Sequence, residues 1–119
     1  MSEKLIKLDV ETIEGFPAAR LVHFEGDLDS TNVETTLGLV NDLIASGVRQ
    51  IVADFSKLRY LNSTGLGILL HISKTARQND GCFKIAQVNE NVYEIIEIIG
   101  AHTLLDIYDK QADAIASLK

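Results

Sequence analysis

Residues 54–67, DFSKLRYLNSTGLG, concentrate the side chains that could take part in chemistry. Ser63 and Thr64 carry hydroxyl groups at the point where an apolar strand pattern gives way to a helical pattern. Asn62 or Ser63 in such a position can cap the helix by accepting a hydrogen bond from a free amide of the first turn. The amides at such a helix start could also bind an anion.

Gly65 and Gly67 leave this first helical turn without side-chain bulk. Each glycine inside a helix costs about 1 kcal/mol relative to alanine, so a purpose for the pair is expected. One interpretation is that they keep the surface open for an approaching partner. The other is that they allow the helix to pack closely on the sheet. Glycine spacing alone leaves both interpretations open.

A catalytic role for Ser63 would need a general base and an oxyanion site as well. The neighbours Asn62 and Thr64 supply no base, and the segment lacks the Gly-x-Ser-x-Gly spacing of a nucleophile elbow. The glycines match neither a dinucleotide fingerprint nor a P-loop. The histidines are far apart and lack metal-ligand spacing; they are His23, His71 and His102. We therefore predict a protein that is not an enzyme and that needs no metal or cofactor.

The composition restricts the partners that this chain could have. With 119 residues, 46% hydrophobic content and a formal net charge of −6, it should fold as one acidic domain spanning residues 1–119. An acidic chain disfavours nucleic acid and anionic membranes, and its charge opposes self-association, so we expect a monomer. The lone Cys82 fits a reducing compartment, and the N-terminus MSEKLIKLDVE is no signal peptide. These features favour a cytoplasmic protein.

The elements that must position Ser63 follow from the periodicity of the sequence. Alternation over residues 6–10 and 19–24 predicts a hairpin with Pro17 in its turn. Thereafter the pattern predicts a helix from Thr31 to Gly47, a strand at 50–55, a loop, a helix at 63–78, a strand at 83–88, a helix at 91–99, a short strand at 104–108 and a C-terminal helix from residue 109 or 110. We expect Thr31 with Glu34, and Asn91 with Glu94, to cap their helices. Val92, Ile95, Ile96 and Ile99 should form the inner face of the helix at 91–99.

This order of elements defines the predicted fold class as α/β. Strands that alternate with helices imply a mixed, mostly parallel sheet joined to an N-terminal β-hairpin, with about four helices packed mainly on one face. Asp29 and Ser63 both follow strands that should be neighbours in this sheet. Because loops at the carboxyl ends of adjacent parallel strands meet, we expect these two residues to lie close together, with Ser63 exposed.

Three short motifs carry a family resemblance. They are Gly26-Asp27-Leu28-Asp29 after the second strand, Asp54-Phe55-Ser56 in the third, and Asn62-Ser63-Thr64-Gly65-Leu66-Gly67 at the helix start. Together they resemble the signature of STAS domains, specifically those of the bacterial anti-sigma factor antagonists. The resemblance covers nearly the whole chain, including the order and lengths of the elements.

The resemblance implies a phosphorylation switch at Ser63. In this family the partner is an anti-sigma factor with ATP-dependent serine protein kinase activity, which binds the unphosphorylated antagonist and so releases a sigma factor. A serine phosphatase restores the binding form, and Asp29 is associated with the phosphorylation site. The resemblance places the partner-binding surface on Asp27, Asp29, Asn62, Ser63, Thr64, Gly65, Leu66 and Gly67.

One residue departs from the family pattern. Antagonists usually have aspartate directly before the phosphorylated serine, whereas this chain has Asn62, which keeps the capping oxygen and loses the charge. This difference could slow phosphorylation or indicate a different partner. The alternative functions are a STAS module that binds a small ligand, such as a nucleotide or a lipid, and a subunit of another partner-switching signalling system.

Overall fold

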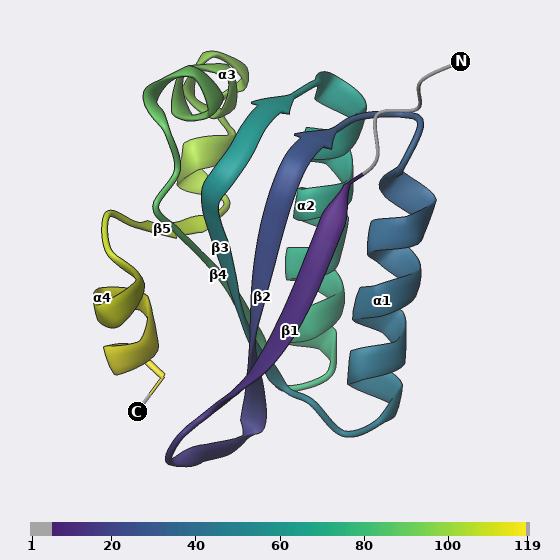
Figure 1. The fold of residues 1–119 in the computed structure, drawn as a ribbon, viewed down its shortest axis with the longest axis vertical. Helices are drawn as coiled ribbons and strands as arrows, with labels where there is room; N and C mark the ends of the chain where they lie inside the picture. The colour runs from purple at the N-terminus through teal and green to yellow at the C-terminus, as the bar shows by residue number, and fades with distance from the viewer. Residues whose placement is uncertain (1–5, 119) are drawn as a thin grey trace.

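A five-stranded sheet forms the centre of the fold in the computed structural model, which describes residues 6–118 (Figure 1). Residues 1–5, on which the prediction of no signal peptide partly rests, lie outside the described part. The elements in chain order are β1 (Lys7–Ile13), β2 (Phe16–Leu28), α1 (Val33–Ala45), β3 (Gln50–Leu61), α2 (Ser63–Gln78), β4 (Cys82–Ala86), α3 (Glu90–Ile99), the 3₁₀ turn η1 (Ala101–Thr103), β5 (Asp106–Tyr108) and α4 (Gln111–Ala116). This order confirms the predicted alternation of strands and helices.

The strand order β1-β2-β3-β4-β5 makes the sheet mixed and mostly parallel, as predicted. β1 and β2 form an antiparallel hairpin, whereas β2, β3, β4 and β5 pair in parallel with one another. β1 is therefore an exposed edge, and its outward charged side chains, among them Lys7, Asp9 and Glu11, are of the kind that discourages edge-to-edge pairing. The monomeric state remains a prediction.

The helices lie unequally on the two faces of the sheet, which confirms that most of them cover one face. Residues of α1, α2 and α3 pack on one face in the main core, to which α3 contributes Val92 and Ile96. Phe24 and Phe55 meet edge to face in this core, with ring centroids 4.9 Å apart. The short α4 lies on the opposite face (Figure 1), where Ala114 and Leu118 close a smaller apolar cluster.

The sheet differs from the sequence prediction at two places. Residues 56–61 were expected in a loop, but β3 continues through them and pairs with the end of β2, as in Leu28↔Leu61. Gly26, at φ 110°, lies where the register of this pairing shifts, a conformation that favours glycine. Pro17 lies inside β2 and not in the turn, which is formed at Glu14 and Gly15.

Helix ends and inner faces also correct the prediction. The N-cap of α1 is Asn32 and not Thr31, because the Thr31 hydroxyl donates instead to Asp29 Oδ1 at 2.6 Å. The N-cap of α3 is Asn89 and not Asn91, and its side chain accepts from the Val92 amide at 2.8 Å. Ile99 lies outside the apolar inner face of α3 because it is 53% exposed next to the left-handed Gly100 that ends the helix.

A buried carboxylate, Asp54 in β3, joins several elements on the face that α4 covers. It is 3% exposed and accepts hydrogen bonds from the Ser56 amide at 2.8 Å and from Gln111 Nε2 at 2.6 Å. Gln87 Nε2 lies 3.3 Å from Asp54 Oδ2, and His23 Nδ1 lies 3.9 Å from the same oxygen. Burial raises the pKa of Asp54, but the hydrogen bonds from Ser56 and Gln111 and the charge of His23 outweigh this and leave the pKa below its ordinary value.

Acidification should therefore destabilise the fold partly through Asp54. Because its pKa is lower in the folded than in the unfolded chain, its contribution to the free energy of unfolding is present above about pH 4 and is lost as the pH falls further. Asp54→Asn cannot ionise, so its free energy of unfolding should fall less steeply than that of the wild type between about pH 5 and pH 2. Urea unfolding across this range measures the slopes. Asp9→Asn, in the exposed part of β1, should keep the wild-type slope, and a wild-type slope for Asp54→Asn would contradict the assignment.

Candidate functional site

The start of α2 presents two exposed hydroxyl side chains, those of Ser63 and Thr64. Asn62 is the N-cap, with extended backbone, and its Oδ1 accepts a hydrogen bond from the Gly65 amide at 2.8 Å. Of the two capping candidates, Asn62 and Ser63, it is Asn62 that caps the helix. Because Asn62 makes the cap, the Ser63 hydroxyl is not required for it, and the first amides of the helix lack acceptors within the helix. The Ser63 side chain is exposed, as predicted, and it lies next to the positive partial charge of the helix start.

The end of β2 holds the start of α2 in place. The Asn62 amide donates to the Leu28 carbonyl at 3.3 Å, so the loop that begins at Asp29 adjoins the start of α2. This backbone contact supports the prediction that Asp29 and Ser63 lie close together. The parallel pairing of β2 with β3 brings the ends of both strands to the same edge of the sheet.

The two glycines of α2 have different roles. A Cβ atom on Gly65 would lie 2.5 Å from the Leu28 carbonyl oxygen and 2.9 Å from Leu61 Cδ1, whereas a Cβ on Gly67 would meet nothing within 4 Å. Gly65 therefore permits close packing of helix on sheet, and Gly67 leaves an open, exposed surface. The close-packing interpretation is thus confirmed for Gly65, while the approach of a partner over Gly67 stays a prediction.

Asp29 has a defined side-chain conformation in the loop after β2. Its Oδ1 accepts from the Thr31 amide at 2.9 Å and from the Thr31 hydroxyl at 2.6 Å. Asn32 bridges the same loop, since its Oδ1 accepts from the Asp29 amide at 3.1 Å and its Nδ2 donates to the Asp27 carbonyl at 2.7 Å. Asn32 was not singled out from the sequence, because its side chain makes no capping hydrogen bond at the start of α1 and instead bridges this loop.

Asp27 and Leu66 support the site from inside and do not present their side chains at the surface. Asp27 is buried at the end of β2 and lies 3.3 Å from Arg59 of β3 in an ion pair. Leu66 is 1% exposed and belongs to the main core, and Gly65 is buried as well. Asp27, Gly65 and Leu66 are thus not at the surface, and their place in the predicted contact surface stays a prediction. The predicted residues left at or near the surface are Asp29, Asn62, Ser63, Thr64 and Gly67.

Arg59 was not singled out from the sequence, although its side chain is exposed and neutralises the charge of Asp27. Its position on β3 opposite the end of β2 becomes evident only from the strand pairing. The local surface is consequently less negative than the sequence motif Gly26-Asp27-Leu28-Asp29 implies.

The other side chains considered for chemistry are possible metal ligands and the Cys82 thiol. In the part of the chain that the structure describes, no three His, Cys, Asp or Glu side chains are grouped so that they could hold a metal ion. Burial raises the pKa of the Cys82 thiol, which disfavours the reactive thiolate. No helix among residues 6–118 has the length and apolar character to cross a membrane.

These features define an α/β domain with a hydroxyl-bearing helix start at the carboxyl edge of a mixed sheet. The sequence matches the STAS domain family over residues 7–114, and the chain belongs to that family. It is 28% identical over 114 residues to a candidate anti-sigma factor antagonist, BtrV, of Bordetella bronchiseptica, covering 96% of each chain.

Solved structures share this fold at lower sequence identity. An anti-sigma factor antagonist from Mycobacterium paratuberculosis matches with a TM-score of 0.82 and 21% identity over 96% of this chain and 94% of that one. The antagonist SpoIIAA in its unphosphorylated form matches with a TM-score of 0.77 and 18% identity, over 93% and 95% of the two chains. The phosphorylated form of Bacillus SpoIIAA matches with a TM-score of 0.71 and 16% identity, over 95% and 100%.

The different environments of the two glycines predict opposite effects of the same substitution. Gly65→Ala should lower the free energy of unfolding by about 1–3 kcal/mol, because its methyl group must displace the Leu28 carbonyl or the Leu61 side chain. Gly67→Ala is the matched control and should leave stability unchanged or raise it by up to about 1 kcal/mol, since the helix gains propensity without a clash. Urea denaturation of both variants measures this, and the reverse order would refute the packing role of Gly65.

Proposed function

We propose that this protein is an anti-sigma factor antagonist whose binding to its partner is switched by phosphorylation of Ser63. The observation that carries the proposal is the exposed Ser63 hydroxyl in the first turn of α2, next to a cap that Asn62 provides. The relative of Bordetella bronchiseptica supports the antagonist role by its name. SpoIIAA, a structural neighbour, has been solved both with and without its phosphate, which supports a phosphorylation switch.

In this mechanism the chain is the substrate of a serine kinase and does not itself catalyse the transfer. The Ser63 oxygen attacks the γ-phosphorus of an ATP molecule held by the anti-sigma factor, ADP leaves, and the hydroxyl proton passes to a base. Asp29, whose loop adjoins Ser63, is the carboxylate we assign to assist this step. Hydrolysis by a serine phosphatase returns Ser63 to the hydroxyl form.

Phosphorylation should change affinity without unfolding the domain. The phosphate adds about −1.5 to −2 charges at neutral pH, and the amides at the start of α2 favour that charge. Because Asp27 is buried and paired with Arg59, repulsion by Asp27 contributes little. The loss of affinity instead comes from placing a bulky, strongly hydrated group in a contact that must lose water.

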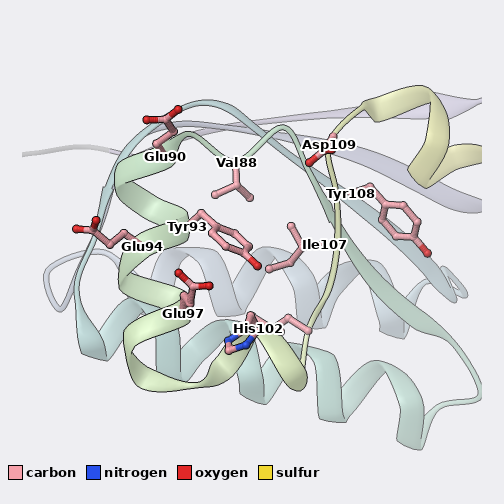
Figure 2. A pocket seen from close by; sticks show the side chains of 10 residues that line it. Val88, Glu90, Tyr93, Glu94, Glu97, His102, Ile107, Tyr108 and Asp109 are labelled. Atoms are coloured by element: carbon pink, nitrogen blue, oxygen red, sulfur yellow. The ribbon is translucent and has the colours of Figure 1, made fainter.

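A pocket between α3 and β5 does not favour the alternative of a nucleotide or anionic lipid ligand. This pocket, of about 510 Å³, lies between α3 and β5 and is lined by carboxylates, among them Glu97 and Asp109 (Figure 2). Carboxylates repel phosphate groups, so we retain a protein partner as the proposed ligand. Thermal shift with a nucleotide panel tests this choice.

The switch predicts opposite behaviour of two Ser63 variants. Ser63→Ala should stay folded, lose phosphorylation at the main site and bind the anti-sigma factor constitutively. Ser63→Asp should stay folded and bind about a hundredfold or more weakly. The partner is identified by affinity capture on the unphosphorylated protein with mass spectrometry, and titration calorimetry then measures both affinities. Thr64→Ala, which removes the adjacent exposed hydroxyl, is the control and should still be phosphorylated. Equal affinities of the two Ser63 variants would show that Ser63 does not control partner binding.

Asp29 provides a second prediction about the same site. Asp29→Asn keeps an oxygen that can accept from Thr31, so the loop should stay folded, while phosphorylation of Ser63 should slow by about tenfold or more. Single-turnover transfer from radiolabelled ATP with the captured kinase measures the rate. Glu34→Gln removes an exposed carboxylate from the first turn of α1 and should leave the rate unchanged. A wild-type rate for Asp29→Asn would remove Asp29 from the mechanism.

A further inference from the structure

Exposed apolar side chains gather where α3 ends and η1 begins. Ile98 is 76% exposed, Ile99 is 53% exposed and Leu104 is 57% exposed, and they lie within seven residues of one another in the chain. Tyr93, one helical turn or more before them on α3, is also exposed. Single exposed apolar residues are ordinary, but a group of large ones on one short segment is typical of an interaction surface.

The same segment holds nearly all of the net charge of the protein. Residues 85–109 contain five carboxylates and neither lysine nor arginine; the carboxylates are Glu90, Glu94, Glu97, Asp106 and Asp109. The whole chain has 17 acidic and 11 basic residues, so the remainder has 12 acidic and 11 basic residues and a net charge of −1. Among the described residues, the ion pair recorded for these five carboxylates is that of Asp106 with Lys84 at 3.7 Å. The segment thus carries a charge of −5, of which the fold pairs one carboxylate, Asp106, with Lys84.

A pocket of about 510 Å³ lies between α3 and β5, and the exposed Tyr93 is one of its lining residues. Figure 2 shows Tyr93 and Glu97 on the side of α3 that faces Ile107 of β5, while Glu90 and Glu94 lie on the outer side of the helix. His102 of η1 also lines the pocket, and its Nδ1 is the buried side-chain atom without a hydrogen-bond partner in the described part of the chain. The pocket therefore has an apolar wall, an acidic rim and an unsatisfied ring nitrogen.

We propose that α3, η1 and β5 form a second docking surface, which binds a basic amphipathic segment of a partner protein. Ile98, Ile99 and Leu104 would cover the apolar face of that segment, and the carboxylates of α3 and Asp109 would pair with its lysine or arginine side chains. The charge complementarity selects this occupant, because a second copy of the chain would bring another −5 to the same surface. None of these residues belongs to the surface assigned to the Ser63 switch, so the inference does not depend on that switch.

A synthetic peptide tests the surface directly. The probe is a fluorescein-labelled helical peptide of about 16 residues, with leucine at i, i+3, i+4 and i+7 and with lysine and arginine on the flanking positions. Fluorescence anisotropy measures its affinity for the full chain, and amide chemical-shift mapping locates it. We expect micromolar binding that weakens with salt, with shifts confined to residues 88–109. The same peptide with glutamate at the basic positions should not bind.

Matched variants separate the proposed surface from nonspecific attraction to an acidic protein. Ile98→Ser and Glu94→Lys should each weaken binding about tenfold, and both change exposed side chains, so the fold should persist. Val10→Ser and Glu14→Lys make the same chemical changes on exposed positions of the hairpin and should alter the affinity by less than about twofold. Ser63→Asp should bind the peptide as the wild type does.

Several results would overturn the proposal. Absence of binding, equal binding of the glutamate peptide, or equal weakening by the two hairpin variants would each show that the charged apolar surface does not select a basic segment. Shifts centred on the start of α2 would assign the peptide to the Ser63 surface instead. A dimer in light scattering that Ile98→Ser dissociates would show that a second copy occupies this surface.

Discussion

The contact between the end of β2 and the first turn of α2 is the constraint on which the site depends. The Leu28 carbonyl accepts from the Asn62 amide, and the absence of a side chain at Gly65 lets the helix approach that carbonyl. A helix held this close to the sheet has a fixed start, so the Ser63 hydroxyl has a fixed place relative to the loop of Asp29. Buried groups, the Leu28 carbonyl and Gly65, thus position the exposed Ser63 hydroxyl.

Local patterns were sufficient to predict the order of elements, the mixed sheet and the exposure of Ser63. Contacts between segments distant in the chain were not predictable in this way. The extension of β3 through Leu61 depends on its pairing with β2, and the burial of Asp27 depends on an ion pair with Arg59 from that same pairing. The capping box at Thr31 failed because Asp29, two residues earlier, competes for the threonine hydroxyl.

The distribution of charge separates two parts of the molecule that the overall composition conceals. The net charge of the whole chain is −6, and residues 85–109 alone carry a net charge of −5. The start of α2 lies outside this segment, and Arg59 compensates Asp27 beneath it. A partner that approaches Ser63 and a partner that approaches α3 therefore meet different electrostatic environments on one small domain.

The Asp54 network has a consequence for the order in which the chain can complete its structure during synthesis. Asp54 lies at the centre of the sheet, but two of its hydrogen-bond donors, Gln87 and Gln111, are made much later. Until α4 leaves the ribosome, the central strand carries a carboxylate that lacks its shortest hydrogen bond. Burial of that strand before α4 is in place therefore carries a desolvation cost, so the docking of α4 favours closure of the sheet around Asp54.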